Sequence, residues 1–448
     1  MGTGNSEIDG NNMLSTRRLV TIDSNCQCSP PADGYLRGVT FADNQSHFGS
    51  ARASFYIEVM SEPIFSVTAN EPFRIAVPDS VLVDLKARLH NTRWPDQMPG
   101  TEWEYGTELT ALQKLCAYWA DEYDWRAAEA SLNAWPQFKA TVDDQTLHYA
   151  HIRSPHPDAL PLVLTHGWPG SIAEFLKVAA PLLEPVAHGG SASDAFHLVI
   201  PSILGYGFSG PTTVRGINTL HVSQSISALM AYLGYSRYGV QGGDWGSIIS
   251  SGMGLIDPEH VVGVHVNMVM GRPTDPANPL EGVLPDEMPG LAFMKSFREY
   301  EVGYQEIQKT RPQTLAYGLT DSPAGLAGWI LEKFRQWSDC DGDPFKAFSK
   351  DELCTNLMIY WVTGTINSST RLYFETIGPG RAGAMPKIEV PVGCAVFPKE
   401  LYQAPRVWAE NQYNVQHWSK FSAGGHFAAM EQPVVLVGDI QSFFRTVR

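Results

Sequence analysis

The sequence predicts an α/β protein in which a mostly parallel β-sheet carries helices on both faces. From Phe138 onward, short apolar runs alternate with helical stretches. Three of these runs are Leu162–Leu164, Phe196–Ile200 and Tyr238–Val240, and each leads into a turn that is rich in glycine. Strands that alternate with helices in this way are typical of βαβ units, which build parallel sheets. We therefore expect a sheet covered by helices, with functional residues on the turns.

The 448 residues divide into five parts by composition and pattern. Residues 1–70 are rich in Ser, Asn, Gly and Asp and have little periodicity, so we expect a poorly ordered tail. Residues 71–145 have helical spacing and predict an N-terminal helical extension. Residues 146–285 form the first part of the α/β core. Residues 286–375 are helical and aromatic, which predicts an inserted cap, and residues 376–448 complete the core.

Charge and composition limit the partners of this chain. The formal net charge is -15, which argues against nucleic acid, because binding to phosphates needs clustered Lys and Arg. No apolar run reaches the roughly 18 residues that a transmembrane helix needs. No basic region followed by an apolar stretch marks a secretory signal. We expect a soluble cytoplasmic protein in preference to one associated with microsomal membranes, and the sequence leaves a homodimer open.

Neither the cysteines nor the histidines predict a metal site. The six cysteines are scattered without a paired CxxC spacing, so we interpret them as reduced thiols. His148 and His151 are close together, but in a strand positions three apart point to opposite faces. We expect no metal and no cofactor.

The segment Gly242-Gly243-Asp244-Trp245-Gly246 lies between a predicted strand and a predicted helix. Small residues two positions before and after a central residue are typical of a nucleophile elbow, a turn too tight for larger side chains. The usual occupant of the centre is Ser, whereas here it is Asp244. A carboxylate can attack an electrophilic sp³ carbon, as in an epoxide or alkyl halide, and form an ester. The alternative is that Asp244 only caps the helix.

The segment His166-Gly167-Trp168-Pro169 follows an earlier predicted strand. In proteins with such an elbow, backbone N–H groups from this loop and from the residue after the nucleophile stabilise an oxyanion. These donors would be the N–H groups of Trp168 and Trp245, since Pro169 has no N–H. The alternative is a buried turn that needs glycine for its backbone angles.

The order nucleophile, acid, histidine is expected along such a chain. Near the end, Gly424-Gly425-His426-Phe427 follows a predicted strand, which makes His426 the candidate base. The strand Val390–Val396 leads to Glu400, the candidate acid that orients the histidine, and Glu410 is the second choice. The alternative for Glu400 is a surface residue of the next helix.

Together these segments resemble the microsomal-type epoxide hydrolases, from about Phe73 to the end of the chain. The family has an N-terminal domain like Phe73–Pro95 and three signature stretches like residues 166–171, 242–247 and 424–429. The resemblance implies an α/β-hydrolase fold and two cap tyrosines that donate hydrogen bonds to the epoxide oxygen, here Tyr304 and Tyr373. It also implies conversion of an epoxide and water to a vicinal diol without a cofactor.

One departure and two alternatives remain. Leu204 stands where the family usually has Pro, beside the predicted pocket. A haloalkane dehalogenase shares the nucleophile and the fold, although a halide favours N–H donors where an epoxide oxygen favours O–H donors. A ligand-binding protein on the same scaffold is the other alternative, since a fold does not fix a function.

Overall fold

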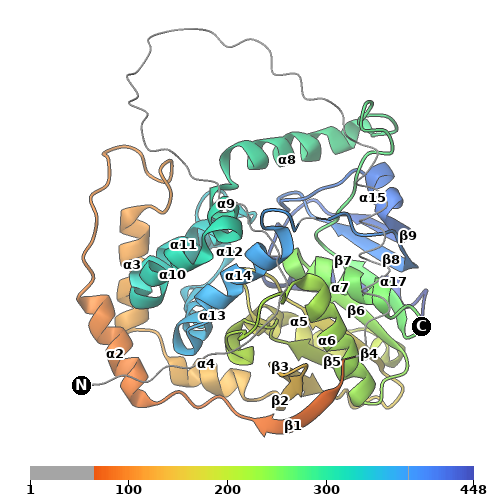
Figure 1. The fold of residues 1–448 in the computed structure, drawn as a ribbon, viewed down its shortest axis with the longest axis horizontal. Coiled ribbons are helices and arrows are strands. Elements are labelled where there is room, and N and C mark those ends of the chain that lie inside the picture. The colour runs from red at the N-terminus through yellow and green to blue at the C-terminus, as the bar shows by residue number, and fades with distance from the viewer. Residues whose placement is uncertain (1–64, 382) are drawn as a thin grey trace, which may run out of the picture. The chain divides into compact units, whose positions relative to one another are not determined.

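Short apolar runs form the buried strands of one large β-sheet (Figure 1). Phe196–Pro201 and Tyr238–Gly242 are buried at every position, as expected for strands with both faces covered. This computed structural model describes residues 65–381 and 383–448, and there the sheet has nine strands in the order β1-β2-β3-β5-β4-β6-β7-β8-β9. The strands are β1 Val67–Phe73, β2 Gln137–Val142, β3 Gln145–Ile152, β4 Leu160–Thr165, β5 Phe196–Pro201, β6 Tyr238–Gly242, β7 Val261–Val266, β8 Ile388–Val396 and β9 Tyr413–Lys420.

The sheet is mostly parallel, which confirms the predicted fold class. Every neighbouring pair from β5 through β4, β6, β7 and β8 to β9 is parallel. The pairs β3–β5, β2–β3 and β1–β2 are antiparallel and extend the sheet on one side. The carboxyl ends of β4, β6 and β8 therefore point the same way, and the turns after them can meet at one edge.

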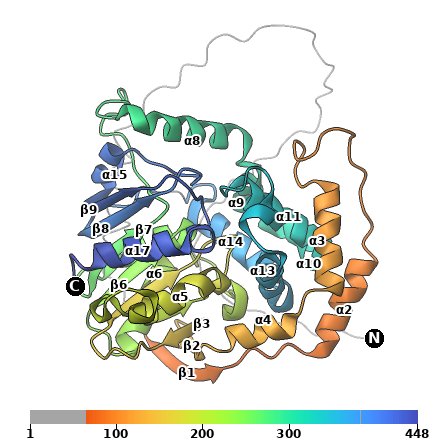
Figure 2. The same cartoon turned by 180° about the vertical axis from the view of Figure 1, so that it is seen from behind.

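Helices cover both faces of the sheet. On β6, a Cβ atom on Gly239 would lie 2.3 Å from Phe444 of α17, whereas one on Gly242 would lie 2.3 Å from the backbone of Gly246 in α7. Positions three apart in a strand face opposite sides, so α7 and α17 lie on opposite faces. Figure 2 brings α17 to the front. The helices of the core are α5 Leu176–Leu183, α6 Thr219–Tyr232, α7 Asp244–Ile256, α15 Arg406–Gln412, α16 Ala428–Glu431 and α17 Pro433–Phe444.

An insertion between β7 and β8 consists of helices, and we call it the cap. It includes the 3₁₀ turn η5 Pro285–Glu287 and the helices α8 Met288–Tyr300, α9 Gly303–Thr310, α10 Pro312–Asp321, α11 Pro323–Gln336, α12 Pro344–Ala347, α13 Lys350–Thr363 and α14 Ile366–Ile377. Several of these helices begin with Pro, whose fixed φ suits the first turn and whose missing N–H costs nothing there.

The first strand corrects the expected boundary of the tail. Residues 1–64 lie outside the described residues, but residues 67–70, assigned to the tail, belong to β1 and pair with β2. The sequence VTANEPF alternates only weakly, and none of its residues is fully buried, as expected for an edge strand held by backbone hydrogen bonds. The expected helical extension, residues 71–145, also contains β2, and thus adds strands as well as helices.

The N-terminal helices α2 Asp79–His90, α3 Leu109–Asp121 and α4 Trp125–Leu132 brace the cap. Helix α3 packs against α11 and α13. The Thr107 hydroxyl donates to the Gly328 carbonyl over 2.6 Å, and the Tyr118 hydroxyl donates to Asp351 over 2.7 Å. The hydroxyls of Tyr123 and Thr355 share a third hydrogen bond of 2.9 Å. The extension therefore fixes the cap on the side away from the sheet (Figure 1).

None of the helices within residues 65–381 and 383–448 has the length and apolar character needed to cross a membrane.

We expect Leu115→Ala to lower the free energy of unfolding by about 2–5 kcal/mol, because Leu115 of α3 is fully buried and its removal leaves a cavity. Urea unfolding followed by circular dichroism measures this loss. Tyr105→Ala is the control, since Tyr105 is 76% exposed and should change stability little. A loss at Leu115 no larger than that of the control would contradict the bracing role of α3.

Candidate active site

Asp244 lies on the sharp turn between β6 and α7 with a φ of 49°. A residue other than glycine in this left-handed region costs about 1–3 kcal/mol, so the surroundings must hold it there. Asp244 is also the first residue of the 13-residue helix α7, whose N-terminal end attracts negative charge. The turn thus presents a carboxylate at the edge of the sheet, in a backbone conformation typical of a nucleophile elbow.

The glycines around Asp244 are required by close backbone contacts. A Cβ atom on Gly246 would lie 1.9 Å from the carbonyl oxygen of Thr165, at the end of β4. A Cβ atom on Gly243 would lie 2.5 Å from the Asn267 amide. No side chain fits at these positions, which explains physically why the sequence pattern contains glycine there.

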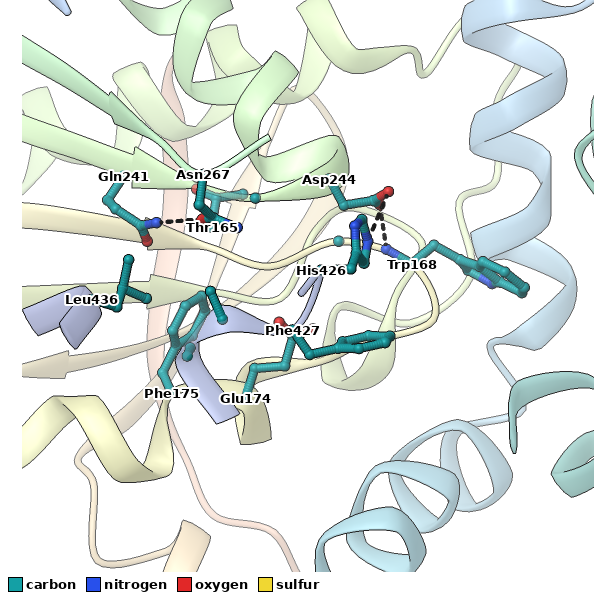
Figure 3. A pocket seen from close by; sticks show the side chains of 14 residues that line it. Thr165, Trp168, Glu174, Phe175, Gln241, Asp244, Asn267, His426, Phe427 and Leu436 are labelled. Atoms are coloured by element: carbon teal, nitrogen blue, oxygen red, sulfur yellow. Dashed lines mark hydrogen bonds and ion pairs between the residues drawn. The ribbon is translucent and has the colours of Figure 1, made fainter. Parts of the chain in front are cut away.

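The loop after β4 holds one oxygen of Asp244. The backbone N–H of Trp168 donates to Asp244 Oδ1 over 2.7 Å (Figure 3). A Cβ atom on Gly167 would lie 2.3 Å from the Asp244 side chain, so only glycine allows this approach. Trp245 follows Asp244 in α7, but among the described residues only Trp168 of the two predicted donors bonds to the Asp244 carboxylate.

His166 supports this loop. Its Nε2 accepts from the Ile203 N–H over 3.3 Å, and its Nδ1 lies 2.9 Å from the Gly167 carbonyl. Burial lowers the pKa of His166 to about 4, against smaller opposite effects of the Gly167 carbonyl and the Asp244 charge. His166 is therefore neutral at pH 7 and fixes the backbone before Trp168.

The cap fixes the other end of the loop. Asn356 of α13 donates to the Pro169 carbonyl over 2.7 Å, and the Tyr360 hydroxyl donates to the Gly170 carbonyl over 2.8 Å. Asn356 also accepts from the Ser171 hydroxyl over 2.8 Å. The position of the Trp168 N–H thus depends on both the core and the cap.

The structure brings His426 between two carboxylates. His426 Nδ1 lies 2.8 Å from Glu400 Oε1, and Nε2 lies 3.4 Å from Asp244 Oδ2. Glu400 and His426 are both buried. Glu410, the second choice for the acid, instead pairs with Arg406 on a half-exposed helix face. Of the two candidates, only Glu400 contacts the histidine.

The two carboxylates control the charge of His426. Burial lowers the pKa of the imidazole, but attraction to Glu400 and hydrogen bonds to Asp244 and Glu400 outweigh it and raise the pKa well above its usual value. The raised pKa favours the imidazolium form of His426 at pH 7 in the resting enzyme. Loss of the Asp244 charge would lower that pKa and favour the neutral base.

Tyr304 of α9 and Tyr373 of α14 lie over the same loop. The ring of Tyr304 stacks on that of Trp168, with centroids 5.4 Å apart and planes 7° apart. Tyr373 meets Trp168 edge-on at 5.8 Å and Trp245 at 4.7 Å. Burial is the main reason that the pKa values of both tyrosines are raised well above 10, and the charge of Asp244 raises them further. Both hydroxyls therefore stay protonated.

Two residues that the sequence did not single out belong to this cluster. The centroid of the Trp337 ring lies 5.1 Å from the ring centroids of His426 and Tyr304. The backbone carbonyl of Trp337 also accepts from the backbone N–H of His426 over 2.8 Å. Lys333 is buried with its ammonium 4.7 Å from the Tyr304 ring centroid and 2.7 Å from Glu332. No sequence motif contains either residue. Trp337 is one of 12 tryptophans in the chain, and Lys333 is a lysine of a cap helix.

The described residues contain no group of three or more His, Cys, Asp or Glu side chains that could hold a metal ion. His148 instead bonds to Ser202 and Gln137, and His151 bonds to Tyr235.

A carboxylate on a strand–helix elbow, followed along the chain by an acid and a histidine that meet it at the sheet edge, defines an α/β-hydrolase. In agreement, residues 161–301 match the family described as "alpha/beta hydrolase fold". Residues 70–175 match the family described as "Epoxide hydrolase N terminus".

Relatives that cover most of the chain narrow this class. A protein of Stigmatella aurantiaca is 44% identical over 378 residues, which are 84% of this chain and 85% of that protein. "Epoxide hydrolase 1" of Sus scrofa is 36% identical over 83% of this chain and 88% of its own length. The crystal structure of juvenile hormone epoxide hydrolase from Bombyx mori superposes with a TM-score of 0.78 at 32% identity, covering 85% of this chain and 95% of that chain. The chain belongs to the epoxide hydrolase family.

We expect Asp244→Asn to lower the pKa of His426, because the substitution removes the negative charge beside Nε2. Titration of the histidine ring signals by NMR measures the shift. Asp257→Asn is the matched control: it should lower the pKa of His260, which Asp257 raises, and leave His426 unchanged. An unchanged His426 pKa in Asp244→Asn would contradict the proposed coupling.

Proposed function

We propose that this protein hydrolyses an epoxide to a vicinal diol through an ester formed on Asp244. The observation that carries this proposal is an Asp on the elbow whose Oδ1 accepts from the Trp168 N–H and whose Oδ2 faces His426. Oδ2 is thus available to attack the substrate. Oδ1 then becomes the ester carbonyl oxygen, which carries the negative charge when water attacks. The family of the chain and the names of its relatives support the same reaction.

In the first step, Asp244 Oδ2 attacks an epoxide carbon, and the bond between that carbon and the ring oxygen breaks. Tyr304 and Tyr373 donate hydrogen bonds to the departing oxygen, which takes a proton. The His426 imidazolium restores that proton to the tyrosines. The products are a hydroxyalkyl ester on Asp244 and a neutral His426, whose pKa falls because the neighbouring charge has gone.

In the second step, His426 takes a proton from water, and the hydroxide attacks Cγ of Asp244. Glu400 holds the imidazole through Nδ1 and stabilises its positive charge. The Trp168 N–H stabilises the oxyanion, and one such donor is worth about 3–4 kcal/mol. Collapse of this intermediate expels the alkoxide, which takes the proton from His426. The new carboxylic acid then gives its proton to His426, which restores the resting ion pair.

A haloalkane dehalogenase is the second candidate, and one observation favours it. The buried indole N–H groups of Trp168 and Trp245 have no hydrogen-bond partner among the described residues, and a halide accepts such bonds. The two buried tyrosine hydroxyls favour an epoxide instead. Parallel assays for diol formation and halide release separate these functions, and absence of turnover with either substrate class would favour a ligand-binding protein.

We expect His426→Gln to form the Asp244 ester with styrene oxide and then to stop. Attack by a carboxylate on carbon needs no base, and solvent water can restore the tyrosine proton in place of His426, whereas activation of water needs the base. Intact-mass spectrometry should detect one added substrate mass, and peptide mapping should locate it on Asp244. Turnover at the normal rate would show that another residue is the base, and a protein that never gains mass in this variant or in the wild type would contradict the covalent mechanism.

We expect Tyr304→Phe and Tyr373→Phe each to slow ester formation by about 10²-fold, the effect of losing one donor to a developing oxyanion. The double variant should have almost no alkylation. Stopped-flow and quenched-flow measurements of ester formation test this, and Tyr317→Phe is the control because Tyr317 is exposed on the cap. Normal alkylation in the double variant would exclude the assigned role.

A further inference from the structure

A small cavity lies beside Asp244 and is not lined by the cap tyrosines. Its lining includes Asp244, His426, Glu174, Thr165 and Gln241. In Figure 3, Thr165, Gln241 and Asn267 lie on the opposite side of Asp244 from the Trp168 ring, on which the tyrosines pack. The cavity volume is about 20 Å³, and roughly 10–15 Å³ of such space accommodates one water molecule. The cavity is therefore suited to water and too small for a carbon skeleton.

Two buried polar side-chain atoms in the lining show that the cavity is polar. Thr165 Oγ1 and Gln241 Oε1 have no hydrogen-bond partner in the described part of the chain. Both side chains are at most 1% exposed. The other end of the Gln241 amide donates to Asn267 over 3.0 Å, which fixes the amide and leaves Oε1 free (Figure 3). Buried polar atoms are costly unless they are hydrogen-bonded, so these two atoms favour the entry of water into the cavity.

Glu174 brings a carboxyl group to the same cavity. It belongs to the 3₁₀ turn η1 Ile172–Phe175, just after the loop that carries Trp168. A Cβ atom on Gly170 would lie 1.3 Å from Glu174 Oε1, so the carboxyl occupies space that only glycine leaves open. Among the described residues, no side chain donates a hydrogen bond to it. The mechanism above gives this group no role.

The surroundings keep Glu174 neutral. Burial raises the pKa of Glu174 to about 8; His426 opposes the rise, Asp244 adds to it, and the Ser171 N–H lowers the pKa. At pH 7 the carboxyl is therefore mostly protonated. A neutral group does not repel the oxyanion that forms on Asp244.

Other charged groups on the elements packed against η1 are already paired or bonded. Lys177 of α5 and Glu352 of α13 form an ion pair with each other. Glu431 of α16 accepts from the Asp339 and Phe427 N–H groups over 2.8 and 3.0 Å. Burial raises the pKa of Glu431 to about 7, so a test of pH dependence must separate it from Glu174.

We propose that Glu174 is a positioning residue that holds, through its neutral carboxyl, the water molecule that attacks the Asp244 ester. This inference rests on the proposed function. One water hydrogen is donated to His426 and is transferred in the reaction; the other is donated to the Glu174 carbonyl oxygen. The water oxygen then faces Cγ of Asp244, and no bond to Glu174 forms or breaks.

The proposal predicts a split between the two chemical steps. With styrene oxide in single turnovers, Glu174→Leu should form the ester at nearly the wild-type rate but hydrolyse it on the order of 10²-fold more slowly, because the water is no longer oriented. Glu174→Gln keeps a neutral acceptor and should stay within about 10-fold of wild type. Gly170→Ala keeps Glu174 but fills its space, and should impair hydrolysis as Glu174→Leu does. Glu184→Gln, at an exposed glutamate after α5, is the control for the substitution itself.

The pH profile provides a second readout that a purely structural role would not change. In the wild type, hydrolysis of the ester should slow at alkaline pH, as Glu174 ionises and its charge opposes the oxyanion. The slowing should be absent in Glu174→Gln and should persist in Glu431→Gln. Persistence in Glu174→Gln, or its loss in Glu431→Gln, would overturn the assignment.

The remaining outcomes are also decisive. Wild-type hydrolysis in Glu174→Leu would overturn the proposal while leaving the ester mechanism intact. Equal loss of both steps would assign Glu174 a structural role. A Glu174→Gln variant as slow as Glu174→Leu would show that the ionised carboxylate is needed. If neither the wild type nor His426→Gln gains mass, the proposed function itself fails.

Discussion

The close approach of α7 to the end of β4 is the contact on which the site depends. The Thr165 carbonyl occupies the position that a side chain on Gly246 would need, and this contact sets the tight turn after β6. The turn forces Asp244 into the left-handed region, and the Trp168 hydrogen bond and the helix N-terminus offset that cost. The same contact brings the loop after β4 within reach of Asp244. The strained backbone and the arrangement of donor and carboxylate therefore have one origin.

A cluster of aromatic rings joins the cap to this core. Trp168 from the core contacts Tyr304 and Tyr373 from the cap, and Trp337 contacts both Tyr304 and His426. The groups proposed to act on the epoxide oxygen and on water are thus connected through direct ring contacts. A change in the packing of the cap would affect the tyrosines and the histidine together. Additional hydrogen bonds from α13 to the loop at Pro169 and Gly170 strengthen this connection.

The sequence was most informative where a residue type had to satisfy a backbone constraint. The glycines around Asp244 and the turn before His426 have fixed spacings because strand ends and tight turns have fixed geometry. Glu400 was predicted from its place after a strand, and its contact with His426 is consistent with that prediction. The mostly parallel sheet followed from the same alternation of strands and helices.

Features that depend on contacts between distant segments could not be read in this way. Strand β1 has no fully buried side chain and is stabilised by backbone pairing with β2, so its side chains gave only a weak signal. Lys333 and Glu174 are ordinary polar residues of helical segments, and only the surrounding tertiary structure reveals that Lys333 lies against Tyr304 and that Glu174 lines the cavity beside Asp244. The helix α4 has only eight residues, which is too short a stretch to establish a helical period from the sequence.

The bracing of the cap by the N-terminal helices has a consequence for the order of folding. The three hydrogen bonds between these segments join residues 221, 233 and 232 positions apart. During synthesis, α3 leaves the ribosome long before α11 and α13 exist, so until then it can pack against α2 but not against the cap. Contacts of such long sequence separation form slowly, and exposed apolar surface favours aggregation in the interval. The N-terminal helices therefore complete their packing late, although they are made first, and the yield of folded protein depends on how well they are protected until the cap has been synthesised.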